Sequence, residues 1–226
     1  MHVTRLPQWA IDRGAVLNSF ATLAADRTAL VNIDMQAVFL AEDQIYGNRH
    51  SRDIVGAVNA LSAAMRAIGA PVIWTRQTHT HDGPCAPPPW QYDPAKPGVA
   101  QGIAALQADT PGHALYREMQ VADSDIVIDK YRYGALSCPA GNLRRTLETL
   151  GVEMILITGT LTNCCCETTA REANLAGYKV IVVSDATATL TDEEHNAALL
   201  NLRLNFADVR TTMQVKSMIA ACVAEV

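Results

Sequence analysis

The sequence predicts an α/β protein in which helices cover both faces of a parallel sheet. Short apolar runs rich in Val and Ile alternate with longer segments whose apolar residues recur at helical spacing. Strands that are buried on both faces read as continuous apolar runs, so this alternation indicates parallel strands joined by crossover helices. The 226 residues are 49% hydrophobic, enough for one sizeable core. We expect a single domain over residues 1–226, with residues 1–27 as an N-terminal extension.

The first half of the chain supplies three of the predicted strands. Thr28–Asp34 is a short, partly β-branched apolar run and predicts the first strand. Ile54–Ile68 has apolar residues at helical spacing and stops at Gly69, a natural helix C-cap. Pro71–Thr75 and Ile126–Ile128 predict the second and third strands.

The second half continues the alternation and ends in a helix. A tight Gly-Thr-Leu-Thr segment separates the fourth strand from the helix that follows it. The predicted elements are the helix Asn142–Leu150, the strand Met154–Thr158, the helix Cys165–Ala176, the strand Lys179–Val183, the helix Asp192–Asn205 and a short sixth strand Val209–Met213.

The stretch from Gln77 to Gly112 breaks this pattern. It contains seven prolines and little clear periodicity, which predicts a long loop. Long loops in compact domains usually have a function. We interpret this one as a segment that covers the substrate or contacts another subunit, and leave open the role of its Pro-rich part, residues 84–97.

Charge and hydropathy exclude several functional classes. The net charge is -5 and no run of basic residues occurs, which argues against nucleic-acid binding. No apolar segment approaches the roughly 20 residues that span a bilayer. Residues 1–14 lack the apolar centre of a secretion signal, so we expect a cytoplasmic location and no membrane partner.

The six cysteines fit neither a disulfide framework nor a zinc site. Three are consecutive, and the chain is not a small secreted domain that lacks a core. Their spacing matches no paired CxxC pattern. The cysteines are Cys85, Cys138, Cys164, Cys165, Cys166 and Cys222.

Reactive side chains follow three of the predicted strands. Asp34 ends the first strand, Lys130 follows the third, and the fourth leads into Cys164–Cys166. Ligands of open parallel sheets bind beyond the carboxyl ends of the strands, so these residues are expected at one edge. A lysine and a helix N-terminus favour a thiolate, a carboxylate can carry its proton, and backbone N–H groups can hold an oxyanion. The set therefore suits acyl transfer.

Each of these residues also has a simpler interpretation. A strand-end aspartate is often a cap, an isolated lysine is usually solvated, and cysteines are among the most buried residue types. Their occurrence together at the predicted ligand edge favours the catalytic interpretation.

The segments VNIDMQAVFL, VIDKYRYGAL and ITGTLTNCCCETTAREANLAGYKVIVVSDATAT resemble the isochorismatase-like cysteine hydrolase superfamily, from Thr28 onward. The resemblance implies a three-layer α/β/α sandwich with a six-stranded parallel sheet in the order 3-2-1-4-5-6. It also implies a catalytic triad of Asp34, Lys130 and Cys165. The family pattern places the nucleophile two residues after Asn163, which selects Cys165. Cys164 and Cys166 are then expected to be small core hydrophobes.

The same resemblance implies the local geometry before the nucleophile. A non-proline cis peptide is expected between Thr160 and Leu161. The backbone N–H groups of Leu161 and Cys165 are expected to form the oxyanion hole. Homodimers or homotetramers are also implied.

The substrate class follows from the branch of the family. The sequence looks closest to the ureidoacrylate amidohydrolase and N-carbamoyl hydrolase branch, and a cysteine nucleophile favours C–N bond hydrolysis of a small amide or ureide. Nicotinamidases carry a DxH metal motif, but Asn48 stands two residues before His50 here. We predict no metal and no cofactor. Whether the pair of His79 and His81 binds a metal stays open.

Several further residues are candidates for binding the substrate. Arg132 is positioned to pair with a carboxylate or to lie on the surface, and Trp74 to line the pocket or pack in the core. The candidates are Gln36, Trp74, Gln77, Tyr131, Arg132 and Tyr133, with Trp90 in the long loop. Two alternatives stay open, a hydrolase of a non-amide bond on the same scaffold and a silent thiol redox sensor.

Overall fold

The sheet contains six parallel strands in the order β3-β2-β1-β4-β5-β6, as seen in a computed structural model that describes residues 1–224. This order confirms the predicted fold class. The strands are β1 (Thr28–Ile33), β2 (Val72–Gln77), β3 (Ile126–Lys130), β4 (Met154–Thr160), β5 (Lys179–Ala188) and β6 (Asp208–Arg210).

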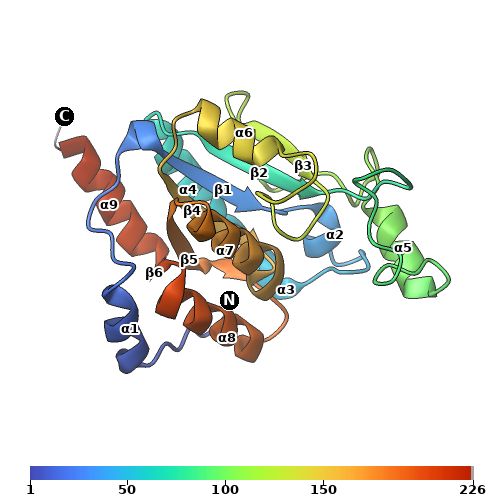
Figure 1. Cartoon of the computed structure of the whole chain (residues 1–226), viewed down its shortest axis with the longest axis horizontal. Helices are drawn as coiled ribbons and strands as arrows, with labels where there is room; N and C mark the ends of the chain where they lie inside the picture. Colours follow the sequence, from blue (N-terminus) through green and yellow to red (C-terminus); the bar gives the residue numbers. More distant parts are fainter. Residues whose placement is uncertain (225–226) are drawn as a thin grey trace.

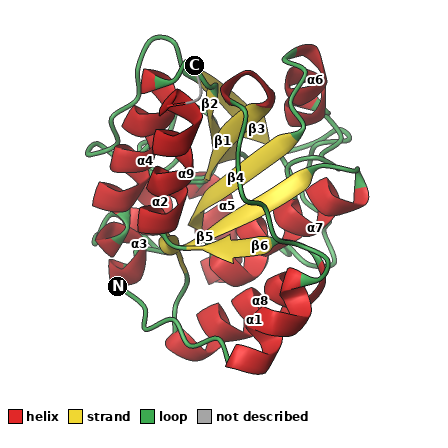
Figure 2. Ribbon diagram, turned by 90° about the vertical axis from the view of Figure 1, so that its left-hand side faces the viewer, coloured by secondary structure: helices red, strands yellow, loops and turns green. Residues whose placement is uncertain are grey.

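Helices form a layer on each face of the sheet (Figure 2). One layer contains α4 and α9, with α2 and α3 beside them, and the other contains α6, α7 and α8. The helices are α1 (Gln8–Ala15), α2 (Ala37–Leu40), α3 (Arg49–Asp53), α4 (Val55–Ala67), α5 (Pro97–Ala105), α6 (Asn142–Thr149), α7 (Glu167–Leu175), α8 (Asp192–Asn205) and α9 (Thr212–Ala224).

The pleat of the strands divides the core into two parts. Leu30 of β1 packs with the α4 and α9 layer, and its neighbour Val31 packs with the α6, α7 and α8 layer. Successive side chains of a strand point to opposite faces, so both need to be apolar in a sheet covered on both sides. This accounts for the continuous apolar runs in the sequence.

A glycine lets the two central strands approach closely at the edge where the site forms. Gly159 of β4 has φ 108°, and a Cβ there would lie 2.0 Å from the backbone oxygen of Ile33 in β1. Only glycine combines this backbone conformation with so close a contact. The ends of β1 and β4 are therefore held side by side.

Among the differences between the structure and the predicted elements, two change the assignment of a segment. Residues 77–112 are not a continuous loop, because Pro97 begins α5, where its fixed φ suits the first helical turn. The sixth strand is Asp208–Arg210, and α9 already begins at Thr212, so the prediction of a strand reaching Met213 is wrong. Figure 1 shows α5 at the end of the molecule toward which β1 and β2 point.

The N-terminal residues lie along α8 (Figure 2). The guanidinium of Arg203 donates to the backbone oxygens of Asn18 and Ile11, and His2 Nδ1 lies 2.7 Å from Asp192 Oδ1. Among residues 1–224, no helix has both the length and the apolar composition needed to cross a membrane.

Candidate active site

Three adjacent strands bring Asp34, Lys130 and Cys165 to one edge of the sheet. Asp34 follows β1 directly, Lys130 is the last residue of β3, and Cys165 lies in a short π-helical turn after β4. The carboxylate and ammonium are 0% and 1% exposed, and Lys130 Nζ lies 2.8 Å from Asp34 Oδ2. A buried ion pair therefore lies beside a buried thiol.

The backbone and side chain of Asp34 are fixed by Thr75 on β2. Asp34 has a positive φ of 48°, and its N–H donates to Thr75 O at 3.2 Å. Thr75 Oγ1 donates to Asp34 Oδ1 at 2.8 Å. The other carboxylate oxygen, Oδ2, is close to Lys130, but accepts no hydrogen bond of good angle from the described residues. The contact between Oδ2 and Lys130 Nζ is an ion pair.

Lys130 is held in its charged form. Nζ donates to Gln77 Oε1 at 2.7 Å and to the backbone oxygen of Arg132 at 3.0 Å. Burial opposes the ammonium, but the Asp34 carboxylate and the Cys165 thiol outweigh it and raise the pKa of Lys130 above its ordinary value. The site therefore keeps a fixed positive charge next to the sulfur.

The side chain of Gln36 fixes the residues around Lys130 by hydrogen bonds. Its Oε1 accepts from the Gln77 N–H at 2.7 Å, and its Nε2 donates to the backbone oxygens of Gln77 and His113. The side chain is fully buried and does not line the cavity. Gln36 therefore holds Gln77 in position by hydrogen bonds, and it is not the substrate contact expected from sequence.

The adjacent thiols of Cys164 and Cys165 influence each other's protonation. Their interaction lowers the pKa of Cys164 and raises that of Cys165. Burial raises the pKa of Cys165 further, although the charge of Lys130 opposes this. Cys165 is therefore a neutral thiol in the resting site, whereas the sequence suggested a thiolate already favoured by the lysine.

The third consecutive cysteine has a different role. Cys166 is fully buried in the core, and burial raises its pKa well above the ordinary value. Cys164 packs against the core, as expected, but it is only partly buried and also lines the cavity. The cavity thus presents two sulfur atoms, Cys164 and Cys165.

The segment before Cys165 packs closely against the π-helical turn. The Thr160–Leu161 peptide bond is cis. The N–H groups of Cys164 and Cys166 donate to the backbone oxygen of Leu161, at 3.1 and 3.2 Å. Leu161 also lines the cavity.

The cavity beside the two thiols has a volume of about 420 Å³. Its walls are mainly apolar and aromatic, and none of the described residues that line it is charged. They are Phe39, Ile45, Tyr46, Gly47, Gln77, His79, Tyr92, Leu106, Tyr133, Leu161, Cys164, Cys165 and Leu190. A small apolar cavity with a few polar groups is typical of a site for a small molecule.

The predicted binding residues divide between this cavity and its surroundings. Gln77 and Tyr133 line the cavity. Tyr131 and Arg132 line a small adjoining hollow, which Gln77 and Tyr133 also border. The guanidinium of Arg132 donates to the backbone oxygens of Pro84 and Cys85, so it tethers the Pro-rich segment, and its pairing with a substrate carboxylate stays a prediction.

The structure does not bring the two tryptophans into the site. Trp74 is fully buried in the core against the α4 layer, and its indole N–H donates to Asp125 Oδ2 at 2.8 Å. Trp90 is 81% exposed. Trp74 points to the opposite face of the sheet from its neighbour Ile73, as the pleat requires, and so packs away from the thiols.

Sequence reasoning missed several residues of the cavity wall. Tyr92 comes from the Pro-rich segment and Leu106 follows α5, both within the stretch that showed little periodicity. His79 was considered only as part of a metal-binding pair. Its position two residues after Gln77 at the end of β2 is the signal that it faces the same edge.

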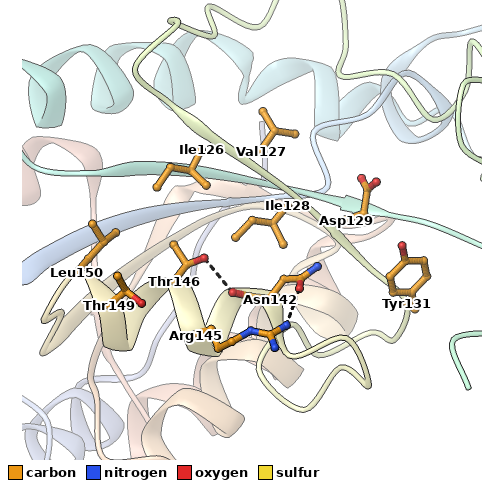
Figure 3. A pocket seen from close by; sticks show the side chains of 10 residues that line it. All are labelled: Ile126, Val127, Ile128, Asp129, Tyr131, Asn142, Arg145, Thr146, Thr149 and Leu150. Atoms are coloured by element: carbon orange, nitrogen blue, oxygen red, sulfur yellow. Dashed lines mark hydrogen bonds between the residues drawn. The ribbon is translucent and has the colours of Figure 1, made fainter.

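A second hollow, of about 640 Å³, lies along β3 and α6 (Figure 3). It runs from Leu150 at one end to Asp129 and Tyr131 at the other, with Thr146 Oγ1 donating to Asn142 O at 2.9 Å. It is open to solvent and contains none of the three triad residues. Of the three predicted triad residues, Cys165 lines the smaller cavity.

His79 and His81, the predicted metal-binding pair, lie in different surroundings. His79 lines the cavity, whereas His81 is turned toward Gln107, with 2.8 Å between His81 Nε2 and Gln107 Nε2. In the part of the chain that the structure describes, no three His, Cys, Asp or Glu side chains are grouped to hold a metal ion. The absence of a metal stays a prediction.

The isochorismatase domain model matches residues 28–214, which include every strand of the sheet. The chain belongs to the isochorismatase family. This isochorismatase-family chain is 33% identical over 181 residues to nicotinamidase 3 of Arabidopsis thaliana, covering 79% of this chain and 82% of that protein. It is 30% identical over 195 residues to a ureidoacrylate amidohydrolase of Methylobacterium radiotolerans, covering 79% and 74%.

A solved structure also resembles the isochorismatase-family chain. A cysteine hydrolase from Pseudomonas syringae pv. phaseolicola 1448A superposes with a TM-score of 0.79 at 28% identity, over 90% of this chain and 97% of that one. These comparisons confirm the superfamily predicted from the sequence motifs. The family is one of hydrolases that includes amidases.

Proposed function

We propose that the chain hydrolyses the C–N bond of a small amide or ureide, with Cys165 as nucleophile and a thioester intermediate. The observation that carries this proposal is the position of Cys165, which opens onto the 420 Å³ cavity beside the buried Asp34–Lys130 ion pair. A nucleophile, a proton acceptor and a fixed cation at one cavity are the groups that acyl transfer requires.

In the first half of the reaction Asp34 Oδ2 accepts the Cys165 proton as the sulfur attacks the carbonyl carbon. The charge of Lys130 stabilises the sulfur anion, and the N–H groups of Leu161 and Cys165 stabilise the oxyanion. The C–N bond then breaks, and Asp34 gives the proton to the leaving nitrogen. Ammonia or an amine departs, and the acyl group stays on the sulfur.

In the second half water replaces the amine. Asp34 accepts a proton from the water as its oxygen attacks the thioester carbon. The C–S bond breaks, the acid product leaves, and the sulfur of Cys165 recovers its proton. The raised pKa of Cys165 supports this use of a general base, because the resting thiol holds its proton until Asp34 accepts it.

Ammonia release tests the proposal. The wild-type protein, Cys165→Ala and Cys164→Ala are assayed on a panel of primary amides and N-carbamoyl compounds, with Cys85→Ala as a control at a cysteine outside the cavity lining. We expect Cys165→Ala to lose activity by at least about a thousandfold, since no other group forms the thioester. Full activity in a folded Cys165→Ala variant contradicts the proposal.

A further inference from the structure

Residues 1–7, which we call the N-terminal arm, contact the residues that hold the turn of Cys165. The isochorismatase domain model does not include the arm. His2 nevertheless inserts its ring between those of His50 on α3 and His195 on α8, with 4.2 and 4.5 Å between ring centroids. The side chain of His2 is only 2% exposed, so this residue of the arm is part of the protein interior.

Both ring nitrogens of His2 are bonded at the junction between β5 and α8. The Thr189 N–H donates to His2 Nε2 at 3.0 Å, and His2 Nδ1 lies 2.7 Å from Asp192 Oδ1. Because Nε2 accepts a hydrogen bond, the ring holds its proton on Nδ1, which donates to the carboxylate. The ring therefore fixes the backbone of Thr189 and the first residue of α8 together.

Thr189 connects His2 with the turn that contains the nucleophile. Its Oγ1 donates to Asn163 Oδ1 at 2.6 Å, and its backbone oxygen accepts from Asn48 Nδ2 at 2.7 Å. Asn163 belongs to the π-helical turn Thr162–Cys166 and is exposed, so this hydrogen bond, more than core packing, fixes its side chain. The hydroxyl of Thr189 holds Asn163 only while the backbone of Thr189 stays in place.

His195 makes a second connection between the arm and the same turn. The residue is fully buried, and its Nδ1 lies 3.0 Å from Oγ1 of Thr162, the first residue of the turn. Its other ring nitrogen, Nε2, lies 3.4 Å from Thr4 Oγ1 in the arm. One face of the ring packs against His2. The arm therefore limits the movement of the ring that holds Thr162.

The position of this turn decides where the sulfur and the N–H group of Cys165 lie. Both groups take part in the proposed reaction, the sulfur as nucleophile and the N–H as a donor to the oxyanion. A displacement of about 1 Å of a reacting group can lower a rate by about a hundredfold, even when its cause lies far from the chemistry. Contacts that fix Thr162 and Asn163 are therefore expected to affect the rate.

We propose that His2 is a positioning residue for the reaction. By fixing Thr189 and His195 it holds the turn Thr162–Cys166 in the position from which the sulfur attacks the substrate. The inference rests on the proposed function for the role of Cys165. It adds the N-terminal arm, whose residues do not line the cavity, to the parts of the chain that determine the rate.

Kinetics and hydrogen–deuterium exchange of the full-length His2→Leu variant test the assignment. Leucine keeps an apolar side chain in the stack but accepts no hydrogen bond from Thr189. We expect kcat for ammonia release to fall about tenfold with KM within about twofold, since the cavity wall is unchanged. Amides of residues 161–167 should exchange about tenfold faster, and those of β2 should not change. His2→Gln, whose side-chain oxygen accepts a hydrogen bond, should restore part of both.

Two further variants separate positioning from a general loss of stability. Asn196→Ala removes the bonds of Asn196 to Val3 O and the Arg5 N–H, so it loosens the arm but keeps the hydrogen bonds of Thr189. We expect its kcat to stay within about twofold of the wild-type value. Thr189→Val removes the hydroxyl that holds Asn163. Combined with His2→Leu, it should lower kcat by less than the product of the two single effects, because both act on one contact.

An unchanged kcat in His2→Leu, a loss that Asn196→Ala reproduces, or fully multiplicative effects of His2→Leu and Thr189→Val overturn the positioning role.

The exchange measurement separates this inference from the proposed function. Faster exchange of residues 161–167 in His2→Leu but not in Asn196→Ala, without ammonia release by any of the proteins, supports the hold of His2 on the turn and contradicts amide hydrolysis. Ammonia release that depends on Cys165, with the same kcat and the same exchange in His2→Leu and the wild type, supports the proposed function and contradicts the role of His2.

Discussion

The buried Lys130–Asp34 pair predicts a large and non-additive loss of stability when one partner is removed. At 2.8 Å and an effective dielectric constant of about 20, the attraction is about 6 kcal/mol, much of which offsets the desolvation of both charges. Lys130→Met leaves the carboxylate buried without a counter-charge, which costs about 3–5 kcal/mol. For a chain of this size the melting temperature falls by roughly 6–20 °C.

A double-mutant cycle followed by urea unfolding at pH 7 measures the effect. We expect Lys130→Met and Asp34→Asn to be costly alone, and the double variant to cost about 2–3 kcal/mol less than their sum. Lys179→Met is the control, because Lys179 is half exposed and 3.9 Å from Glu153, and should change stability by less than about 0.5 kcal/mol. Additive effects, or a loss below about 1 kcal/mol for Lys130→Met, would refute the reasoning.

Two further predictions concern proton binding. Cys164→Val removes the neighbouring thiol that raises the pKa of Cys165, so the pH dependence of alkylation of Cys165 by iodoacetamide should move to lower pH; Cys166→Val is the control, and an unmoved midpoint speaks against this cause. His195 is fully buried, and burial with the nearby His2 lowers its pKa to about 4. The folded state therefore excludes a proton that the unfolded chain binds below about pH 6.5, and stability should fall by about 3 kcal/mol from pH 6.5 to 4. Urea unfolding across this range should show a shallower fall for His195→Gln, and equal slopes for the two proteins would contradict this origin.

The fold was predictable because strands that are buried on both faces of a sheet consist of continuous apolar residues. Leu30 and Val31 are both apolar because they enter different halves of the core. The proximity of Asp34 and Lys130 was predictable because both follow apolar runs, and parallel strands end at one edge of the sheet. For both the fold and this pair, the informative observation was where a residue lies along its strand.

The remaining contacts around the site join residues that are far apart in the chain, so local sequence patterns do not predict them. Arg132 bonds to backbone oxygens 47 and 48 residues away, and nothing in its neighbourhood indicates them. Pro97 resembles a breaker but begins a helix. Trp74 was considered both as a pocket residue and as a core residue, and the pleat, which directs its side chain to the other face, places it in the core.

The different surroundings of the three thiols could not be predicted from the sequence. Three consecutive cysteines do not show which sulfur atoms reach the cavity, and the turn at Thr162–Cys166 decides it by placing Cys164 and Cys165 at the cavity and Cys166 in the core. The direction in which the pKa of each thiol moves therefore depends on the local backbone as well as on residue type.

The most direct test of the account is the location of the acyl group during turnover. A reaction with an amide substrate is quenched in acid, and the peptide that contains Cys164–Cys166 is fragmented by mass spectrometry. The account predicts an added acyl mass on the sulfur of Cys165, absent from Cys165→Ala. An acyl group on Cys164, or turnover by Cys165→Ala with no acyl-enzyme, would contradict it.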